Sequence, residues 1–164
     1  MTNARNLSRL EKSVIPASIA AGLDLDAIEI HKRKWTFLTP ANVTVARGTK
    51  IFYPNDPGSP RQLTDNLRHL AHMVHEVVHV WQYEKLGINF YAPQWLDRRY
   101  HYRLKAGDMF QSFGLEQQAA IAEDSFLVRH RLQPRWAKNN PSLQLLQKTV
   151  ANCDINPIEA LGQV

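Results

Sequence analysis

The longest segment without a helix-breaking residue constrains the fold most. Residues 62–86 contain neither proline nor glycine. Apolar residues at helical spacing in this segment are Leu67, Leu70, Val74, Val77, Val78 and Trp81. This spacing predicts an amphipathic helix, because side chains three and four residues apart lie on one helical face. Gly87 follows directly and predicts the end of the helix, since glycine readily ends helices.

The predicted helix carries the motif His75-Glu76-x-x-His79. Its histidines are four residues apart, so both imidazoles lie on one helical face with a carboxylate beside the first. Zinc accepts imidazole and carboxylate ligands, and a catalytic zinc site uses three protein ligands. Cys153 is the one cysteine, which excludes a multi-cysteine zinc site. The alternative interpretation is a pair of buried histidines that only form hydrogen bonds with their neighbours.

A second helix, predicted over residues 115–133 and ended by Pro134, offers a third ligand. Glu116 lies in its first turn, and Ala119 and Ala120 follow on the same face. Small residues would let this helix approach the first one closely, so that Glu116 reaches the metal. The alternative is that Glu116 only favours the helix N-terminus through the helix dipole.

Other polar side chains on these helices are predicted to lie near the site without binding the metal. Glu123 is on the face of Glu116 and Asp124 is turned further round, and either could orient a ligand imidazole. His72 lies one turn before the His75 and His79 pair, and we expect it to line the pocket rather than bind the metal. His69 is expected on the surface.

The remaining segments predict a single α+β domain, residues 1–164. The length of 164 residues and the apolar content of 44% suffice for one core. Residues 6–23 have helical spacing with a break at Pro16, and residues 27–37 and 43–53 alternate as strands do. The strand region 43–53 contains Gly48, so it is either a tight hairpin or one strand with an irregularity. A loop is predicted at 53–61, a short strand at 100–104, and helices at 142–152 and 157–161.

The part of the chain over residues 43–126 resembles a known family. The resemblance rests on the string HEVVHVWQY from His75 to Tyr83, the Tyr100-x-Tyr102 pair, and the block Glu116-Gln-Gln-Ala followed by Asp124. These residues resemble zincin-like metallopeptidases of the gluzincin type, and more closely small bacterial Rhs- or Vgr-related proteins associated with secretion systems. The resemblance implies a small, mainly antiparallel sheet packed on the active-site helix, and a second helix that bears a ligand.

The same resemblance implies that His75, His79 and Glu116 bind Zn²⁺ and that Glu76 is the catalytic acid and base. Zinc lowers the pKa of its bound water, and a neighbouring glutamate can move the water proton to the leaving amine. A tyrosine hydroxyl could stabilise the oxyanion. Tyr102 is our choice for that role, with Tyr100 and Tyr83 as alternatives.

The function predicted from these features is zinc-dependent hydrolysis of peptide bonds, with the strand region 43–53 pairing with the substrate backbone. The resemblance implies an antibacterial effector, with a secretion-apparatus spike protein and a cognate immunity protein as partners. The start of the chain predicts no signal peptide, so export by the secretion apparatus would bring it to a target-cell periplasm. Alternatives are an intracellular processing protease, an enzyme acting on cell-wall peptides, and a non-catalytic adaptor with a structural metal.

The sequence gives no reason to expect a membrane span or a nucleic-acid partner. The net charge of +5 is too small to name a partner, and no apolar run is long enough for a membrane span. Basic residues form two groups without a nucleic-acid motif, so no nucleic-acid partner is expected. These groups are Arg98, Arg99, Arg103 and Lys105, and Arg129, Arg131, Arg135 and Lys138, the latter with Trp136 among them. Trp95 is the tryptophan expected to contact a substrate.

Overall fold

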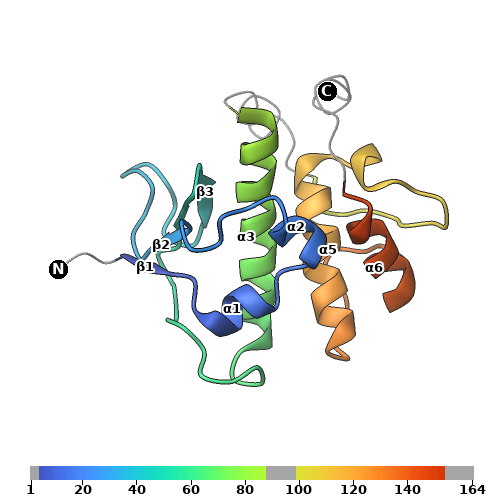
Figure 1. The fold of residues 1–164 in the computed structure, drawn as a ribbon, viewed down its shortest axis with the longest axis horizontal. Helices are drawn as coiled ribbons and strands as arrows, with labels where there is room; N and C mark the ends of the chain where they lie inside the picture. The colour runs from blue at the N-terminus through green and yellow to red at the C-terminus, as the bar shows by residue number, and fades with distance from the viewer. Residues whose placement is uncertain (1–3, 88–98, 154–164) are drawn as a thin grey trace.

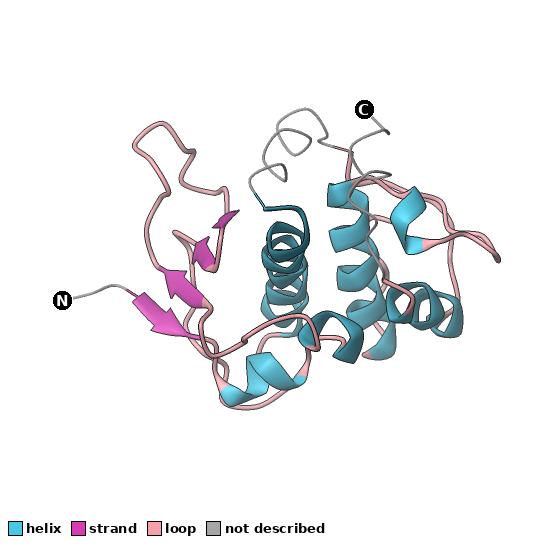
Figure 2. Ribbon diagram, turned by 45° about the horizontal axis from the view of Figure 1, so that its top comes forward, coloured by secondary structure: helices cyan, strands magenta, loops and turns pink. Residues whose placement is uncertain are grey.

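The computed structural model describes residues 4–87 and 99–153. It confirms the α+β class: a small sheet lies on one side of a central helix and further helices lie on the other (Figure 1). The central helix, α3 (Leu67–Leu86), stands between the sheet and α5 (Leu115–Arg129), which runs beside it (Figure 2). No helix in the described residues is long and apolar enough to cross a membrane.

Helix α3 begins later than the sequence pattern predicts. The side chain of Asn66 caps it by accepting the backbone N–H of His69 at 3.0 Å. Asp65 accepts the backbone N–H groups of Arg61 and Gln62, which holds the residues before Asn66 in a turn and keeps them out of the helix. The predicted end is confirmed, because Gly87 follows the helix with a φ of 61°.

The sheet is mixed, and two of its three strand pairs are antiparallel, in line with the mainly antiparallel sheet that was expected. Its strands are β1 (Ala4–Asn6), β2 (Glu29–His31), β3 (Val45–Arg47) and β4 (Lys50–Phe52), in the order β1-β2-β4-β3. The outer pairs are antiparallel, but β2 and β4 are parallel. The chain passes from β2 to the far edge at β3 and returns through a hairpin, so the second hairpin strand runs alongside β2.

The hairpin settles the ambiguity of residues 43–53 and puts β3 at an edge of the sheet. Arg47 pairs with Lys50, which leaves Gly48 and Thr49 as a two-residue turn. Gly48 has a φ of 58°, a conformation that glycine adopts without strain. β3 packs against α3, so this edge of the sheet lies beside the central helix (Figure 1).

Most of the other helices follow the sequence pattern. The predicted break at Pro16 separates α1 (Arg9–Ser13) from α2 (Ala17–Ala20). Helix α6 (Leu143–Ala151) is capped by Ser142, whose side chain accepts the N–H of Leu145. A short 3-10 helix, η2 (Phe110–Ser112), precedes α5. The helix predicted at 157–161 lies outside the described residues.

Three predicted elements are shorter in the structure. Helix α5 ends at Arg129 rather than at residue 133, because Arg131 has a φ of 60° and Leu132 N–H turns back to the Leu127 carbonyl. The strand predicted at 27–37 shrinks to β2. The alternation at 100–104 is an extended segment with a single bridge between Tyr102 and Ala137.

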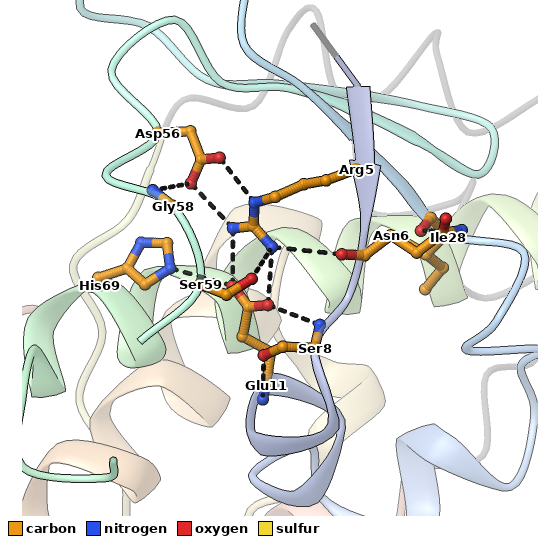
Figure 3. Close-up of polar contacts among 9 residues, drawn as sticks. All are labelled: Arg5, Asn6, Ser8, Glu11, Ile28, Asp56, Gly58, Ser59 and His69. Atoms are coloured by element: carbon orange, nitrogen blue, oxygen red, sulfur yellow. Dashed lines mark hydrogen bonds and ion pairs between the residues drawn. The ribbon is translucent and has the colours of Figure 1, made fainter. Parts of the chain in front are cut away.

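An ionic clamp, formed by Arg5, Glu11, Asp56 and His69, ties the N-terminal strand to the rest of the fold (Figure 3). The Arg5 guanidinium donates to both carboxylates at 2.8–2.9 Å. His69 on α3 donates to Glu11 at 3.1 Å. His69 is buried, which corrects the expectation that it is a surface residue. The clamp joins β1, α1, the loop after β4 and α3.

Candidate metal centre

Three side chains on α3 and α5 meet in the way that a metal site requires. Glu116 Oε2 lies 3.4 Å from His75 Nε2 and 3.1 Å from His79 Nε2. One donor atom from each of the three residues lies within 4.8 Å of the others. Ligand atoms bound tetrahedrally to zinc at about 2.0–2.1 Å lie about 3.3 Å apart. The donor set and its spacing therefore fit a metal ion such as zinc.

Close packing of α3 and α5 brings these groups together. Ala119 and Ala120, on the same face of α5 as Glu116, are fully buried. Their small side chains let the two helix axes approach, as the sequence predicts. His75, His79 and Glu116 are all buried as well, so their charges interact through protein rather than through water.

The pKa shifts of these three groups indicate how strongly they interact. Burial alone would lower the pKa of His75, but the nearby carboxylates of Glu116 and Glu123 outweigh it and raise this pKa to about 10. Burial would also lower the pKa of His79, and the Glu116 charge reverses the sign. The pKa of Glu116 lies below its usual range because the two histidines outweigh its burial. A metal ion bound by these groups would therefore have to displace the proton that the raised pKa favours on His75.

Glu123 is positioned to orient the His75 ring, as the sequence predicted for either Glu123 or Asp124. Its Oε2 lies 3.1 Å from His75 Nδ1, which leaves Nε2 directed at Glu116. Trp136 Nε1 donates to the same carboxylate at 2.6 Å, and Arg135 pairs with it at 3.2 Å. Arg135 also lies over the Trp136 ring. Arg135, from one of the predicted basic groups, and Trp136, which lies among that group, therefore hold the Glu123 carboxylate beside His75.

Gln82 orients the second histidine, and sequence reasoning missed it. Its amide nitrogen donates to the Leu115 carbonyl and to Gln118 Oε1, both at 3.0 Å. Its oxygen is therefore the acceptor for His79 Nδ1 at 2.8 Å. A proton held on Nδ1 leaves the Nε2 lone pair for a metal. The signal was available, because Gln82 is three residues after His79 on the same helical face.

Glu76 and His72 lie beside the ligand cluster and are not part of it. The Glu76 side chain is buried, and its Oε1 lies 3.6 Å from His72 Nε2. The same nitrogen is 2.9 Å from Thr44 Oγ1, just before β3. Burial lowers the pKa of His72, so the imidazole is neutral near pH 7. His72 thus lies between Thr44, just before the edge strand, and Glu76.

The tyrosines differ in their distance from the cluster. Tyr102, predicted to be catalytic, is buried, and its hydroxyl donates to Asp124 at 2.8 Å. Burial raises the pKa of Tyr102 above its usual value, and the negative charge of Asp124 raises it further. The Tyr100 ring stacks on His75 at 5.9 Å between centroids. Tyr83 lies against the hairpin turn, because a side chain at Gly48 would meet its ring at 3.6 Å. Tyr100 is thus the tyrosine of the three that contacts a predicted ligand.

Asp124 has a structural role in place of the orienting role that was considered for it. Besides Tyr102, it accepts the backbone N–H groups of Arg135, Trp136 and Ala137 at 2.6–3.1 Å. These bonds hold two extended segments against α5 and so fix Trp136 beside Glu123. Trp95 and Arg98, considered for substrate and nucleic-acid contacts, lie outside the described residues.

Comparison with solved structures finds the same fold in another protein. The chain superposes on the effector domain of Pseudomonas aeruginosa VgrG2b with a TM-score of 0.65. The match covers 90% of this chain and 82% of that domain at 22% sequence identity. No family model matches the sequence, and no curated protein sequence matches it. At this level of identity the likeness establishes a shared fold.

Proposed function

We propose that the chain is a zinc-dependent metallopeptidase of the zincin type. The observation that carries the proposal is the meeting of His75, His79 and Glu116, with Glu76 beside them and outside the ligand set. A structural metal site has no need of a free carboxylate next to its ligands. A catalytic site needs a general base there.

Zinc, when bound by His75, His79 and Glu116, supplies Lewis acidity and lowers the pKa of water toward neutrality. The protein's own residues carry the proton transfers. Glu76 accepts a proton from the attacking water and delivers it to the nitrogen of the leaving amine, so that no covalent bond to the enzyme forms. Burial of Glu76 keeps its carboxylate close to the reacting atoms.

A hydrogen-bond donor for the developing negative charge completes the proposed machinery. We expected Tyr102 in this role, but its hydroxyl is committed to Asp124. Tyr100 is the better supported candidate, because its ring lies against His75. Tyr102 serves in this account as a positioning residue that fixes the segment from which Tyr100 extends.

We propose that a peptide substrate binds in extended form along β3. This strand is at an edge of the sheet and packs on α3, the helix that carries the predicted ligands. The backbone groups along the outer side of such a strand can pair with a peptide backbone. Thr44 and His72 connect the start of β3 with Glu76, which would set the substrate bond near the base.

The shared fold with the VgrG2b effector domain supports a biological setting. We propose that residues 1–164 form a single effector domain that reaches a target-cell periplasm through a secretion apparatus. Its partners would be a spike protein during export, an immunity protein in the producing cell, and a peptide or protein substrate in the target-cell periplasm. Nucleic acid has no part in this proposal, since Arg135 and Trp136 are engaged with Glu123.

The test is hydrolysis of a diverse peptide library, followed by mass spectrometry. We expect zinc-loaded wild type to generate new peptide ends, and Glu76→Gln to slow cleavage by about 10²–10⁴-fold while its zinc content stays the same. Removal of zinc should abolish cleavage and its return should restore it. Equal cleavage by wild type and Glu76→Gln would contradict the role of Glu76.

The effector setting is tested separately in cells. Production of the wild type directed to the periplasm should arrest growth, whereas Glu76→Gln in the same compartment should not. Toxicity that persists in Glu76→Gln would favour the alternative of a non-catalytic adaptor that keeps a structural metal. Toxicity restricted to the cytoplasm would contradict the proposed site of action.

A further inference from the structure

A cavity of about 670 Å³ lies away from the candidate metal centre. It is bounded by α2, α3, α6 and the turn that leads into η2. Its volume is in the range of sites that bind small molecules. Trp81 of α3 forms part of its wall and comes two residues after His79, about 200° further around the helix. The cavity and the metal centre therefore use opposite faces of α3.

A hydrogen-bond donor inside this cavity has no protein acceptor. The Trp81 residue is 1% exposed, and its Nε1 donates to no protein group within residues 4–87 and 99–153. Nε1 is not among the fully enclosed polar atoms that lack a partner, so it opens onto the cavity. A buried indole N–H usually finds a partner. The absence of a side chain at Gly22 keeps space open beside it, because a Cβ there would lie 3.0 Å from Trp81 Nε1. The donor thus faces space that a ligand atom can occupy.

Two lysine side chains line the same cavity as this donor. Lys85 and Lys148 line the cavity, and neither ammonium group has an ion-pair partner among the described residues. Asp108 also lines the cavity. Its carboxylate accepts the Lys105 backbone N–H at 2.8 Å, and this hydrogen bond closes the turn from Lys105 to Asp108. Leu145 and Met109 add apolar surface to the wall. The cavity therefore combines three donors with an apolar lining.

We propose that this cavity is a second binding site, for a small carboxylic acid with an apolar body. The carboxylate would accept the Trp81 indole N–H and pair with Lys85 and Lys148. The apolar body would lie against Leu145 and Met109. A carboxylate can accept the indole N–H and pair with two cations at once, whereas a neutral apolar ligand would leave the indole donor without a partner. The site does not depend on zinc or on peptide hydrolysis.

The test follows the indole N–H signal of Trp81 by nuclear magnetic resonance in the full, zinc-loaded chain. The probe is 3-phenylpropionate, and the matched neutral probe is 3-phenylpropionamide. The signal is assigned from its loss in Trp81→Phe. We expect a saturable shift of this signal with the acid, and at least tenfold weaker binding of the amide.

Variants separate this cavity from other carboxylate sites, the zinc included. Lys85→Gln combined with Lys148→Gln should weaken binding of the acid at least tenfold, and Lys50→Gln, an exposed lysine on β4, should leave it unchanged. Gly22→Ala should also weaken it, because the added Cβ takes the space beside the indole. An unmoved Trp81 signal, or equal affinity of the double lysine variant, would overturn the proposal.

Discussion

At the scale of single residues, the two histidines that we propose as ligands each face a different partner. His75 faces the Glu123 carboxylate and His79 faces the Gln82 amide oxygen. A carboxylate partner makes an imidazole a stronger ligand than an amide partner does, because it adds negative charge. The two positions should therefore respond differently to substitution, although both rings bind the same metal in our account.

Replacement of Glu123 tests this difference. We expect Glu123→Gln to weaken zinc binding by about 10–100-fold, because His75 loses a charged partner. Gln82→Met should have an effect of similar or smaller size, since it removes a neutral acceptor. Zinc competition with a chelating dye measures both. Glu84→Gln, at the exposed end of α3, is the matched control, and an unchanged affinity in Glu123→Gln would refute this orienting role.

The tyrosine pair gives a second prediction at this scale. Tyr100→Phe should lower kcat by about 10²-fold, as expected for loss of one donor to the developing charge. Tyr102→Phe should keep kcat and lower the free energy of unfolding by about 1 kcal/mol, because its hydroxyl supports Asp124. Kinetics on a cleaved peptide and urea unfolding measure the two effects. The reverse pattern would return the catalytic role to Tyr102.

The sequence predicts those site residues that lie on one helix or share a regular helical face. His75, His79, Glu116 and Glu123 all follow from such spacing. Trp136 could not be predicted, because it reaches Glu123 from a loop held in place by Asp124. The role of Tyr102 depends on the same contact between distant segments. Such contacts leave no periodic signal in the chain.

At the scale of elements, periodicity predicts where the long helices are, and local side-chain contacts decide where they end. The start of α3 depends on Asn66 and Asp65, whose oxygen atoms compete for backbone N–H groups. The parallel pairing of β2 and β4 depends on the path between them, which the alternation of apolar residues does not encode. The sequence therefore predicts the class of the fold better than its sheet order.

The ionic clamp predicts how the N-terminal elements respond to acid. Burial would raise the pKa of Glu11, but His69 and Arg5 outweigh it and lower this pKa below the usual value of 4.5. A carboxylate with a lowered folded-state pKa stabilises the fold above its unfolded pKa and loses this effect as the pH falls. The pKa of Asp56 is lowered as well, chiefly by Arg5 acting against burial. The clamp should therefore weaken below about pH 4.5.

Urea unfolding of Glu11→Gln at several pH values measures the clamp. At pH 7 we expect a loss of about 2–3 kcal/mol, somewhat less than for an orphaned buried charge because Asp56 still pairs with Arg5. The difference from wild type should shrink as the pH falls below 4.5. Glu84→Gln, which removes an exposed carboxylate outside the clamp, is the matched control for the loss of one negative charge. A difference that does not change with pH would contradict the clamp.

At the scale of the whole molecule, the candidate metal centre joins α3 to α5. Helix α3 stands at the middle of the fold with α5 beside it (Figure 1). A ligand that binds only the folded state stabilises it. Zinc at a concentration about 100-fold above its Kd should therefore add about 2.7 kcal/mol to the free energy of unfolding. Thermal unfolding with and without a chelator measures this effect, and Glu116→Gln should reduce it strongly. Equal stabilisation of wild type and Glu116→Gln would indicate that zinc binds elsewhere.

The most direct test of the central claim is the zinc content of purified protein by elemental analysis, in wild type, Glu76→Gln and Glu116→Gln. We predict one zinc per chain in wild type and in Glu76→Gln, because Glu76 is a base and not a ligand. Glu116→Gln should lose most of its zinc, because a carboxylate ligand is gone. A wild type without zinc, or full zinc content in Glu116→Gln, would contradict the assignment of His75, His79 and Glu116 as a catalytic metal site.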